Sequence, residues 1–328
     1  MKTSIKINII GLTLFCIIFF GITSTGAMAI GNYNVALRKG TKIYTVTQYD
    51  DAGWKATINS STTPSNWFEG YANQTGAKSK NTIKGWNYVT WETYDVFISL
   101  FLSILFKSED LIPLLALLNS QGYNESSINT NYTNSYNLWF GLSAIWNFTV
   151  GDFKEDPSIA NGPILIFQNP TDIDDILNDY NNLSANLNNN VVIQLSGYTF
   201  PILDSNDFLW LFIFNGLALG SPFHSYLEEL ITSLNCTNAT VDNNRLFINR
   251  VGETNYTVEI IYNSEGIMES FLVKDVADNT IYQIVSSNSD SIFYTVIVIL
   301  LMCIGGFITY LVIWKRKTNR KRKRKIAS

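Results

Sequence analysis

The sequence predicts an α+β fold in which a curved antiparallel β-sheet carries packed apolar helices, followed by one C-terminal transmembrane helix. Residues 245–285 contain four segments of alternating apolar and polar residues separated by turn residues, which is typical of an antiparallel meander. Apolar runs at 96–118 and 208–219 supply the packed helices. A longer uncharged run at 292–314 supplies the membrane span.

The C-terminal anchor is the clearest element. Residues 292–314 are 23 uncharged residues, which at about 1.5 Å of rise per residue exceed the roughly 30 Å hydrocarbon core of a bilayer. Nine Lys and Arg residues follow within 315–325, and such a cluster stays in the cytoplasm. We therefore expect a single span at 292–314, a cytoplasmic tail at 315–328 and a linker at 286–291, which keeps the domain within about 20 Å of the bilayer.

Residues 1–29 have the form of a signal peptide. Two lysines precede the apolar stretch at 7–22, and Ala27-Met28-Ala29 offers small residues at the spacing that signal peptidase accepts. We expect cleavage after Ala29, which leaves an extracellular α+β domain at 30–285. The alternative is an uncleaved first transmembrane helix, which places the same domain outside.

The charged residues divide sharply between the compartments. All 27 acidic residues but only 12 of the 23 basic residues fall within 30–291, so the ectodomain has a net charge of −15. An acidic exterior excludes nucleic acid as a partner, since phosphate binding needs clustered Lys and Arg. The basic tail is explained by topology and by attraction to anionic lipids of the inner leaflet.

Cysteines are sparse outside the membrane. Only Cys236 belongs to the ectodomain, because Cys16 lies in the signal peptide and Cys303 in the anchor. An intramolecular disulfide is therefore excluded in the mature domain. Cys236 is either buried as a small apolar residue or an odd thiol that pairs with another chain.

Nine Asn-x-Ser/Thr sequences occur, all in the exported segment. Export makes them candidate glycosylation sites on the surface of the domain. They are Asn59, Asn73, Asn124, Asn131, Asn147, Asn182, Asn235, Asn238 and Asn255.

Strand-like composition recurs along the domain. The segment 40–48 is rich in alternating β-branched residues, and 54–58 continues it after a turn, which together predict a hairpin. Residues 60–81 are predicted to be loop. Further strands are predicted at 83–94, 138–150 (as a strand or hairpin), 191–200, 245–250, 256–262, 268–274 and 280–285.

The apolar runs form three segments, at 96–106, 111–118 and 208–219. Each is shorter than the roughly 20 residues that a membrane span needs. Buried core helices and a lipid-facing flap are the two interpretations. Residues 119–137 between them are predicted to be a polar linker.

The clearest helix begins after Pro170, because apolar residues recur on one face at Ile173, Ile176, Leu177, Tyr180 and Leu183. The aspartates of its first turn are explained by the helix dipole. A calcium site is the alternative, but the segment lacks the EF-hand pattern. Residues 223–234 predict a short amphipathic helix that holds His224, the only histidine.

The chain resembles two known groups of proteins. The segments Gly40-Thr-Lys-Ile-Tyr-Thr-Val-Thr47 and Ile261-Tyr-Asn-Ser-Glu-Gly-Ile-Met268, with the single helix and its Lys/Arg tail, resemble archaeal surface proteins of the choice-of-anchor S family. That resemblance implies an anchored exoprotein and adds no catalytic residues. The order of strands and apolar helices also resembles, at the level of fold, the half-barrel lipoprotein carriers, whose curved sheet wraps an apolar groove.

Catalysis has little support in the residues. One histidine and one external cysteine cannot build a metal cluster, and no catalytic-triad or phosphate-loop motif occurs. We predict no catalytic, cofactor-binding or metal-binding residues. Carboxylate pairs leave a glycoside hydrolase as a lesser alternative; the pairs are Glu228/Glu229, Asp204/Asp207 and Glu92/Asp95, with Trp86 or Trp91 to stack a sugar ring.

We therefore expect a single-pass cell-surface protein with a non-catalytic ectodomain. The apolar runs and a curved sheet predict a groove for a lipid or another apolar ligand. Its predicted lining is Phe97, Phe101, Leu105, Leu114, Trp210, Phe212 and Phe214. The alternatives are that the runs only fill the core, and that the protein is a structural or adhesion component of a surface coat. The oligomeric state stays open.

Overall fold

The computed structural model describes residues 33–102, 105, 108–153 and 161–288. The predicted signal peptide, membrane span and cytoplasmic tail lie outside the described residues. In the part that is described, no helix is both long and apolar enough to cross a bilayer.

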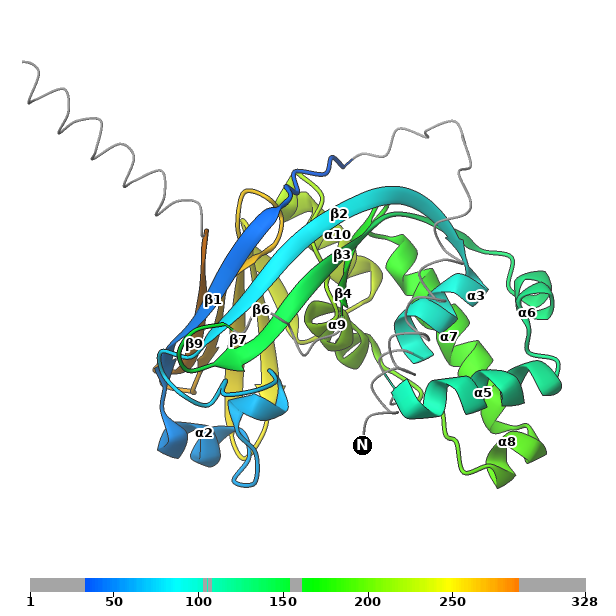
Figure 1. Cartoon of the computed structure of the whole chain (residues 1–328), viewed down its shortest axis with the longest axis horizontal. Helices are drawn as coiled ribbons and strands as arrows, with labels where there is room; N and C mark the ends of the chain where they lie inside the picture. Colours follow the sequence, from blue (N-terminus) through cyan, green and yellow to red (C-terminus); the bar gives the residue numbers. More distant parts are fainter. Residues whose placement is uncertain (1–32, 103–104, 106–107, 154–160, 289–328) are drawn as a thin grey trace, which may run out of the picture.

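One antiparallel sheet organises the described chain. Its strands are β1 (Gly40–Tyr49), β2 (Lys78–Glu92), β3 (Ser135–Thr149), β4 (Asn161–Phe167), β5 (Ala239–Asp242), β6 (Arg245–Val251), β7 (Asn255–Tyr262), β8 (Met268–Lys274) and β9 (Thr280–Asn288). Within the described residues their order is β4-β3-β2-β1-β9-β8-β7-β6-β5. The sheet curls into a half-barrel (Figure 1), which confirms the predicted α+β class and curved antiparallel sheet.

Helices fill the hollow and one end of the half-barrel. They are α2 (Asp51–Thr57), α3 (Thr93–Val96), which runs into the π-helical turn η2 (Phe97–Leu102), α5 (Ser108–Ser120), α6 (Glu125–Asn131), α7 (Asp172–Asn188), α8 (Val191–Leu195), α9 (Ser205–Phe214) and α10 (Phe223–Ser233), with a short 3₁₀ turn at Pro64–Asn66. In Figure 1, α9 lies beneath the arch of β2 and β3, and α3, α5, α6, α7 and α8 gather beyond it.

The predicted meander is confirmed as β6 to β9, and the predicted helices at 172–183 and 223–234 are confirmed as α7 and α10. The apolar face of α7 is buried as the spacing predicts. β9 extends to Asn288, so the first three residues of the predicted 286–291 linker belong to the sheet.

The predicted hairpin of 40–48 with 54–58 is wrong. Residues 51–57 form α2, and β1 pairs with β2, where Gly40 lies opposite Ile83. The Asp50 side chain accepts a hydrogen bond from the Gly53 backbone amide at 3.1 Å, which caps the helix. Burial of Trp54 at 0 % exposure then holds the helix against the sheet.

The predicted strand at 191–200 is also wrong. Its first residues form α8, because the Asn190 side chain accepts hydrogen bonds from the backbone amides of Val192 and Ile193. Such a local cap competes with extended structure even among β-branched residues. Strands β4 and β5 and helix α6, none of which the sequence predicted, complete the fold.

Candidate functional site

The predicted groove residues lie in the interior of the domain. Phe97, Phe101, Leu114 and Phe212 are at most 2 % exposed, while Leu105, Trp210 and Phe214 are half-buried against the same core. The two apolar runs meet through Phe208, whose ring centroid lies 5.7 Å from that of Phe101 and 4.6 Å from that of Phe212.

Little space is left beside Phe97 and Phe101. The cavity there has a volume of about 10 Å³, which is close to the minimum for a single water molecule. In this conformation the apolar runs therefore fill the core at that point, and a ligand would have to take the place of side chains that already pack there.

Helix α9 carries the second of the two apolar runs. Every residue from Phe208 to Phe214 is apolar, and the Asp204 side chain caps the helix by accepting a hydrogen bond from the Asp207 amide at 2.8 Å. Three of the seven residues are buried, and four are only half-buried: Trp210, Leu211, Ile213 and Phe214. A helix that is apolar all round and half-exposed on one side is unusual at a solvent surface.

The chain after α9 is fixed to the edge of the sheet. Gly216 has a φ of +92°, and a Cβ at this position would overlap the carbonyl oxygen of Pro163. This glycine lets Leu165 in β4 donate to the Gly216 carbonyl and accept from the Ala218 amide, each at 2.9 Å. The exit of α9 is therefore held by backbone hydrogen bonds, whereas the helix itself is held by apolar contacts.

An aromatic cluster lies against α9 in the hollow of the sheet. Trp210 packs against Trp67 at 5.4 Å and against Phe214 at 4.8 Å, and Phe214 packs against Phe271 of β8 at 5.7 Å between ring centroids. The Arg250 guanidinium lies 4.2 Å from the Trp210 ring centroid, a favourable cation–π contact. We define the aromatic cluster as Trp67, Phe68, Trp210, Phe214 and Phe271.

Sequence reasoning missed three of the five residues of this cluster: Trp67, Phe68 and Phe271. Trp67 and Phe68 come from the segment predicted to be loop, and the tertiary fold brings them beside Phe271 and Tyr282. The available signal was a pair of adjacent aromatic residues within an otherwise polar stretch. Such a pair is costly to expose to water.

A buried ion pair lies on the same side of the sheet as the aromatic cluster. Lys42 Nζ lies 2.8 Å from Glu265 Oε2, and the Tyr44 hydroxyl donates to the Met268 carbonyl at 3.0 Å. Burial raises the pKa of Tyr44, and the nearby Glu265 charge raises it further. The charges of Lys42 and Glu265 neutralise one another, and the Tyr44 hydroxyl is satisfied by a backbone carbonyl, so these side chains have structural partners.

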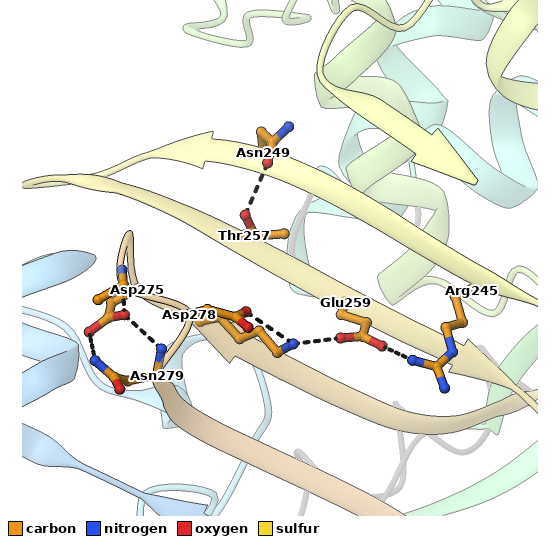
Figure 2. Close-up of polar contacts among 9 residues, drawn as sticks. Arg245, Asn249, Thr257, Glu259, Asp275, Asp278 and Asn279 are labelled. Carbon is orange, nitrogen blue, oxygen red and sulfur yellow. Dashed lines mark hydrogen bonds and ion pairs between the residues drawn. The ribbon is translucent and has the colours of Figure 1, made fainter. Parts of the chain in front are cut away.

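The outer face of the C-terminal strands carries an ion network (Figure 2). Glu259, whose side chain is 4 % exposed, contacts Arg245 at 2.9 Å and Lys274 at 3.0 Å, and Lys274 also contacts Asp278 at 3.2 Å. The hydrogen bond to Glu259 is the main cause that raises the pKa of Lys274. The network ties β6, β7 and β8 together across the sheet.

The carboxylate pairs considered for glycoside cleavage have structural partners. Asp204 caps α9, and the Asp95 side chain accepts from the Glu92 amide at 3.1 Å where α3 begins. Glu228 contacts His224 at 3.3 Å on the exposed side of α10. Within the described residues no group of three or more His, Cys, Asp or Glu could hold a metal ion.

Two other titratable groups stand out for their environment. Burial raises the pKa of Asp172 to about 6, with a hydrogen bond from Asn169 acting in the opposite direction. Burial likewise raises the pKa of the Cys236 thiol to about 11, which makes it a poor nucleophile.

The nine candidate glycosylation sites all fall among the described residues. Six are exposed: Asn59, Asn124, Asn131, Asn182, Asn235 and Asn255. Asn73, Asn147 and Asn238 are half-buried, and the Asn238 Oδ1 atom is buried without a hydrogen-bond partner among the described residues.

No protein-family model, curated protein or solved structure is detectably similar to this chain.

Proposed function

We propose that this chain is a single-pass, glycosylated cell-surface protein whose non-catalytic ectodomain binds a lipid chain or a similar apolar ligand in the hollow of its half-barrel. The observation that carries the proposal is helix α9, in which every residue from Phe208 to Phe214 is apolar, four of the seven are only half-buried, and Trp210 and Phe214 pack against the aromatic cluster.

The anchor supplies the cellular context. The 23-residue uncharged run at 292–314 begins four residues after Asn288, the end of β9. This tether spans at most about 14 Å, so the hollow stays close to a source of apolar ligands. The nine basic residues that follow set the tail in the cytoplasm.

Ligand entry requires α9 to move while its C-terminal exit stays attached to β4. An acyl chain would replace the contacts of Trp210 and Phe214 with Trp67, Phe68 and Phe271. Apolar side-chain contacts would be replaced by apolar contacts with the acyl chain. The free-energy cost of this exchange is small compared with that of opening a polar core.

Photocrosslinking tests the proposal. Full-length protein in lipid nanodiscs is treated with a diazirine-bearing fatty acid, irradiated and mapped by mass spectrometry. We expect crosslinks at 205–214 and at Trp67 or Phe68, reduced several-fold in Trp210→Glu and unchanged in the matched variant Trp86→Glu. The membrane run at 292–314 serves as an internal positive control.

Crosslinks confined to 292–314 would reject the proposed binding of an apolar ligand by the ectodomain. They would still support the proposed membrane anchor. Absence of crosslinks at 292–314, with extraction of the protein by alkaline carbonate, would reject the anchor.

A structural or adhesion role is the second candidate. Its support is an apolar surface at α8, where Val191, Val192 and Leu195 are 64 %, 43 % and 83 % exposed. Exposed apolar patches commonly mark protein contacts. Sedimentation of the detergent-solubilised protein should then show an assembly that Leu195→Glu dissociates and Val276→Glu does not.

A further inference from the structure

The basic residues of the ectodomain gather in its first quarter. Residues 30–90 contain seven basic and three acidic residues, a net charge of +4, whereas residues 91–291 contain five basic and 24 acidic residues, a net charge of −19. The fold turns this asymmetry into a surface feature that we call the basic stripe, formed by Arg38, Lys39, Lys78, Lys80 and Lys84.

The stripe follows the outer face of β2. Lys78 and Lys80 flank the buried Ser79 and therefore point away from the hollow, since successive side chains of a strand alternate. The hydroxyls of Thr41 and Thr82 lie 3.0 Å apart on the same face.

The residues that precede β1 lie at one end of the stripe, beside Lys84. Gly40 pairs with Ile83, which places Lys39 beside Lys84. The Lys39 side chain lies against Gly85, where its Nζ is 3.5 Å from the position that a Cβ would take. Arg38, Lys39, Lys78 and Lys84 are exposed, and Lys80 Nζ lies 4.5 Å from the Trp146 ring centroid.

The other described cations of the ectodomain already have partners. Lys42, Lys55, Arg245 and Lys274 contact carboxylates, and Arg250 lies over Trp210. In the described ranges no ion pair joins a carboxylate to the basic stripe. The stripe is thus a local positive field on a strongly negative domain, and it is complementary to an anion.

The position of the stripe indicates which anion. Lys42 in β1 pairs with Asn288, the last residue of β9, so Arg38, Lys39 and Lys84 lie at the end of the sheet from which the chain leaves for the anchor. The three residues of this tether, 289–291, allow at most about 14 Å between residues 288 and 292. A tilt of the domain about this tether brings these side chains to the lipid headgroups.

We propose that the basic stripe docks the domain against anionic lipid headgroups of the membrane that anchors it. This inference rests on the proposed anchorage. Each basic residue close to such a surface raises the docked population roughly five-fold. Docking through a single stripe, together with the tether, fixes the orientation of the domain on the bilayer.

The test uses full-length protein reconstituted in vesicles of phosphatidylcholine alone or of an equal mixture with phosphatidylglycerol. A membrane-impermeant amine reagent labels exposed lysines, and mass spectrometry gives the rate at each site. We expect labelling of the stripe lysines Lys39, Lys78, Lys80 and Lys84 to be about five-fold slower in the anionic vesicles, with high salt removing the difference. Lys55, which contacts Asp51 and lies outside the stripe, should react equally in both.

A triple variant isolates the stripe. Arg38→Gln, Lys39→Gln and Lys84→Gln together should abolish the anionic-lipid protection of Lys78 and Lys80, whereas Lys55→Gln should leave it unchanged. Equal labelling rates in both vesicles, or protection that survives the triple variant, would overturn the docking proposal.

Two further outcomes are decisive. Protection by dextran sulfate in neutral vesicles, without protection by anionic lipid, would assign the stripe to an anionic polymer and overturn lipid docking. Protein that is released from both vesicles by alkaline carbonate would instead overturn the anchorage, so the two failures are distinguishable.

Discussion

Lys42 Nζ lies 2.8 Å from Glu265 Oε2, although strands β9 and β8 separate β1 from the turn that carries Glu265. The β7–β8 turn leads into β8, which lies two strands, or about 10 Å, from β1, so the two long side chains meet across β9. The two side chains are 7 % and 17 % exposed. This ion pair therefore links the first strand of the sheet to its C-terminal strands.

Lys42→Met should lower the free energy of unfolding by about 3 kcal/mol, because it leaves the Glu265 carboxylate buried without its cation. Urea unfolding followed by circular dichroism measures the change. Lys55→Met is the matched control, since Lys55 contacts Asp51 at 2.7 Å but both side chains are about half-exposed. It should cost less than about 0.5 kcal/mol. Equal effects of the two variants would contradict the role assigned to Lys42.

Glu259→Gln should destabilise the C-terminal strands by about 1.5 kcal/mol, because Arg245 and Lys274 then lose charge-assisted contacts with the carboxylate that they share, while both cations are exposed enough to be rehydrated. Hydrogen exchange of the β6, β7 and β8 amides should accelerate together. Glu269→Gln, at an exposed position of β8, is the control and should leave these rates unchanged. Unchanged exchange in Glu259→Gln would show that the network does not hold the strands.

Gly216→Ala should lower the free energy of unfolding by about 3 kcal/mol, because it combines an unfavourable positive φ with overlap on the Pro163 carbonyl oxygen. Gly197→Ala is the control. Its φ is +82°, but nothing lies within 4 Å of the added Cβ, so the conformational cost of about 1 kcal/mol remains alone. Similar losses in the two variants would show that the contact with β4 does not constrain Gly216.

The environment of Asp172 gives a pH dependence. Because burial raises the pKa to about 6, above the value of about 3.9 in an unfolded chain, the folded state binds the proton more tightly. Stability should therefore fall as the pH rises from about 4 to about 6, by on the order of 1 kcal/mol after solvent screening of a half-buried carboxyl. In Asp172→Asn the midpoint temperature of thermal unfolding should change less with pH over this range.

Asp174→Asn changes a neighbouring carboxyl in the first turn of α7 and should keep the slope. A slope that is the same in Asp172→Asn and the native protein would contradict this assignment.

Glycan mapping of the native protein tests which of the nine Asn-x-Ser/Thr sites lie at the surface of the folded domain. Asn59, Asn124, Asn131, Asn182, Asn235 and Asn255 should carry glycans, since their side chains are exposed. Asn238 should stay largely unmodified, because its Oδ1 is buried and a glycan would prevent that packing. High occupancy at Asn238 with none at Asn255, its exposed counterpart in the C-terminal strands, would contradict the fold in this region.

The sequence identified the elements whose signal is local. Alternation along 245–285 gave strands β6 to β9, and helical spacing gave α7, because in each case the apolar face repeats within one segment. It failed at two positions where a side-chain cap favours a helical backbone over an extended one. The Asp50 and Asn190 caps turned two predicted strands into α2 and α8.

For the candidate site, the sequence predicted that residues 96–118 and 208–219 would meet the curved sheet, and the fold brings Phe101 and Phe208 into contact. It could not identify Trp67 and Phe68 as their neighbours, because no pattern within a loop records which strands it will cover. Nor could it show that the cavity beside Phe101 is only about 10 Å³, since packing depends on how side chains from distant segments interlock.

By itself the sequence determined the division of this protein into a strongly acidic domain, an uncharged run and a basic tail, because charge and hydropathy are properties of consecutive residues. Tertiary structure alone decided which charges neutralise one another. The fold pairs Lys42 with Glu265 and leaves Lys39 and Lys84 exposed beside one another where β1 begins. Partners far apart in the chain become neighbours only when the backbone hydrogen bonds of the sheet set their register.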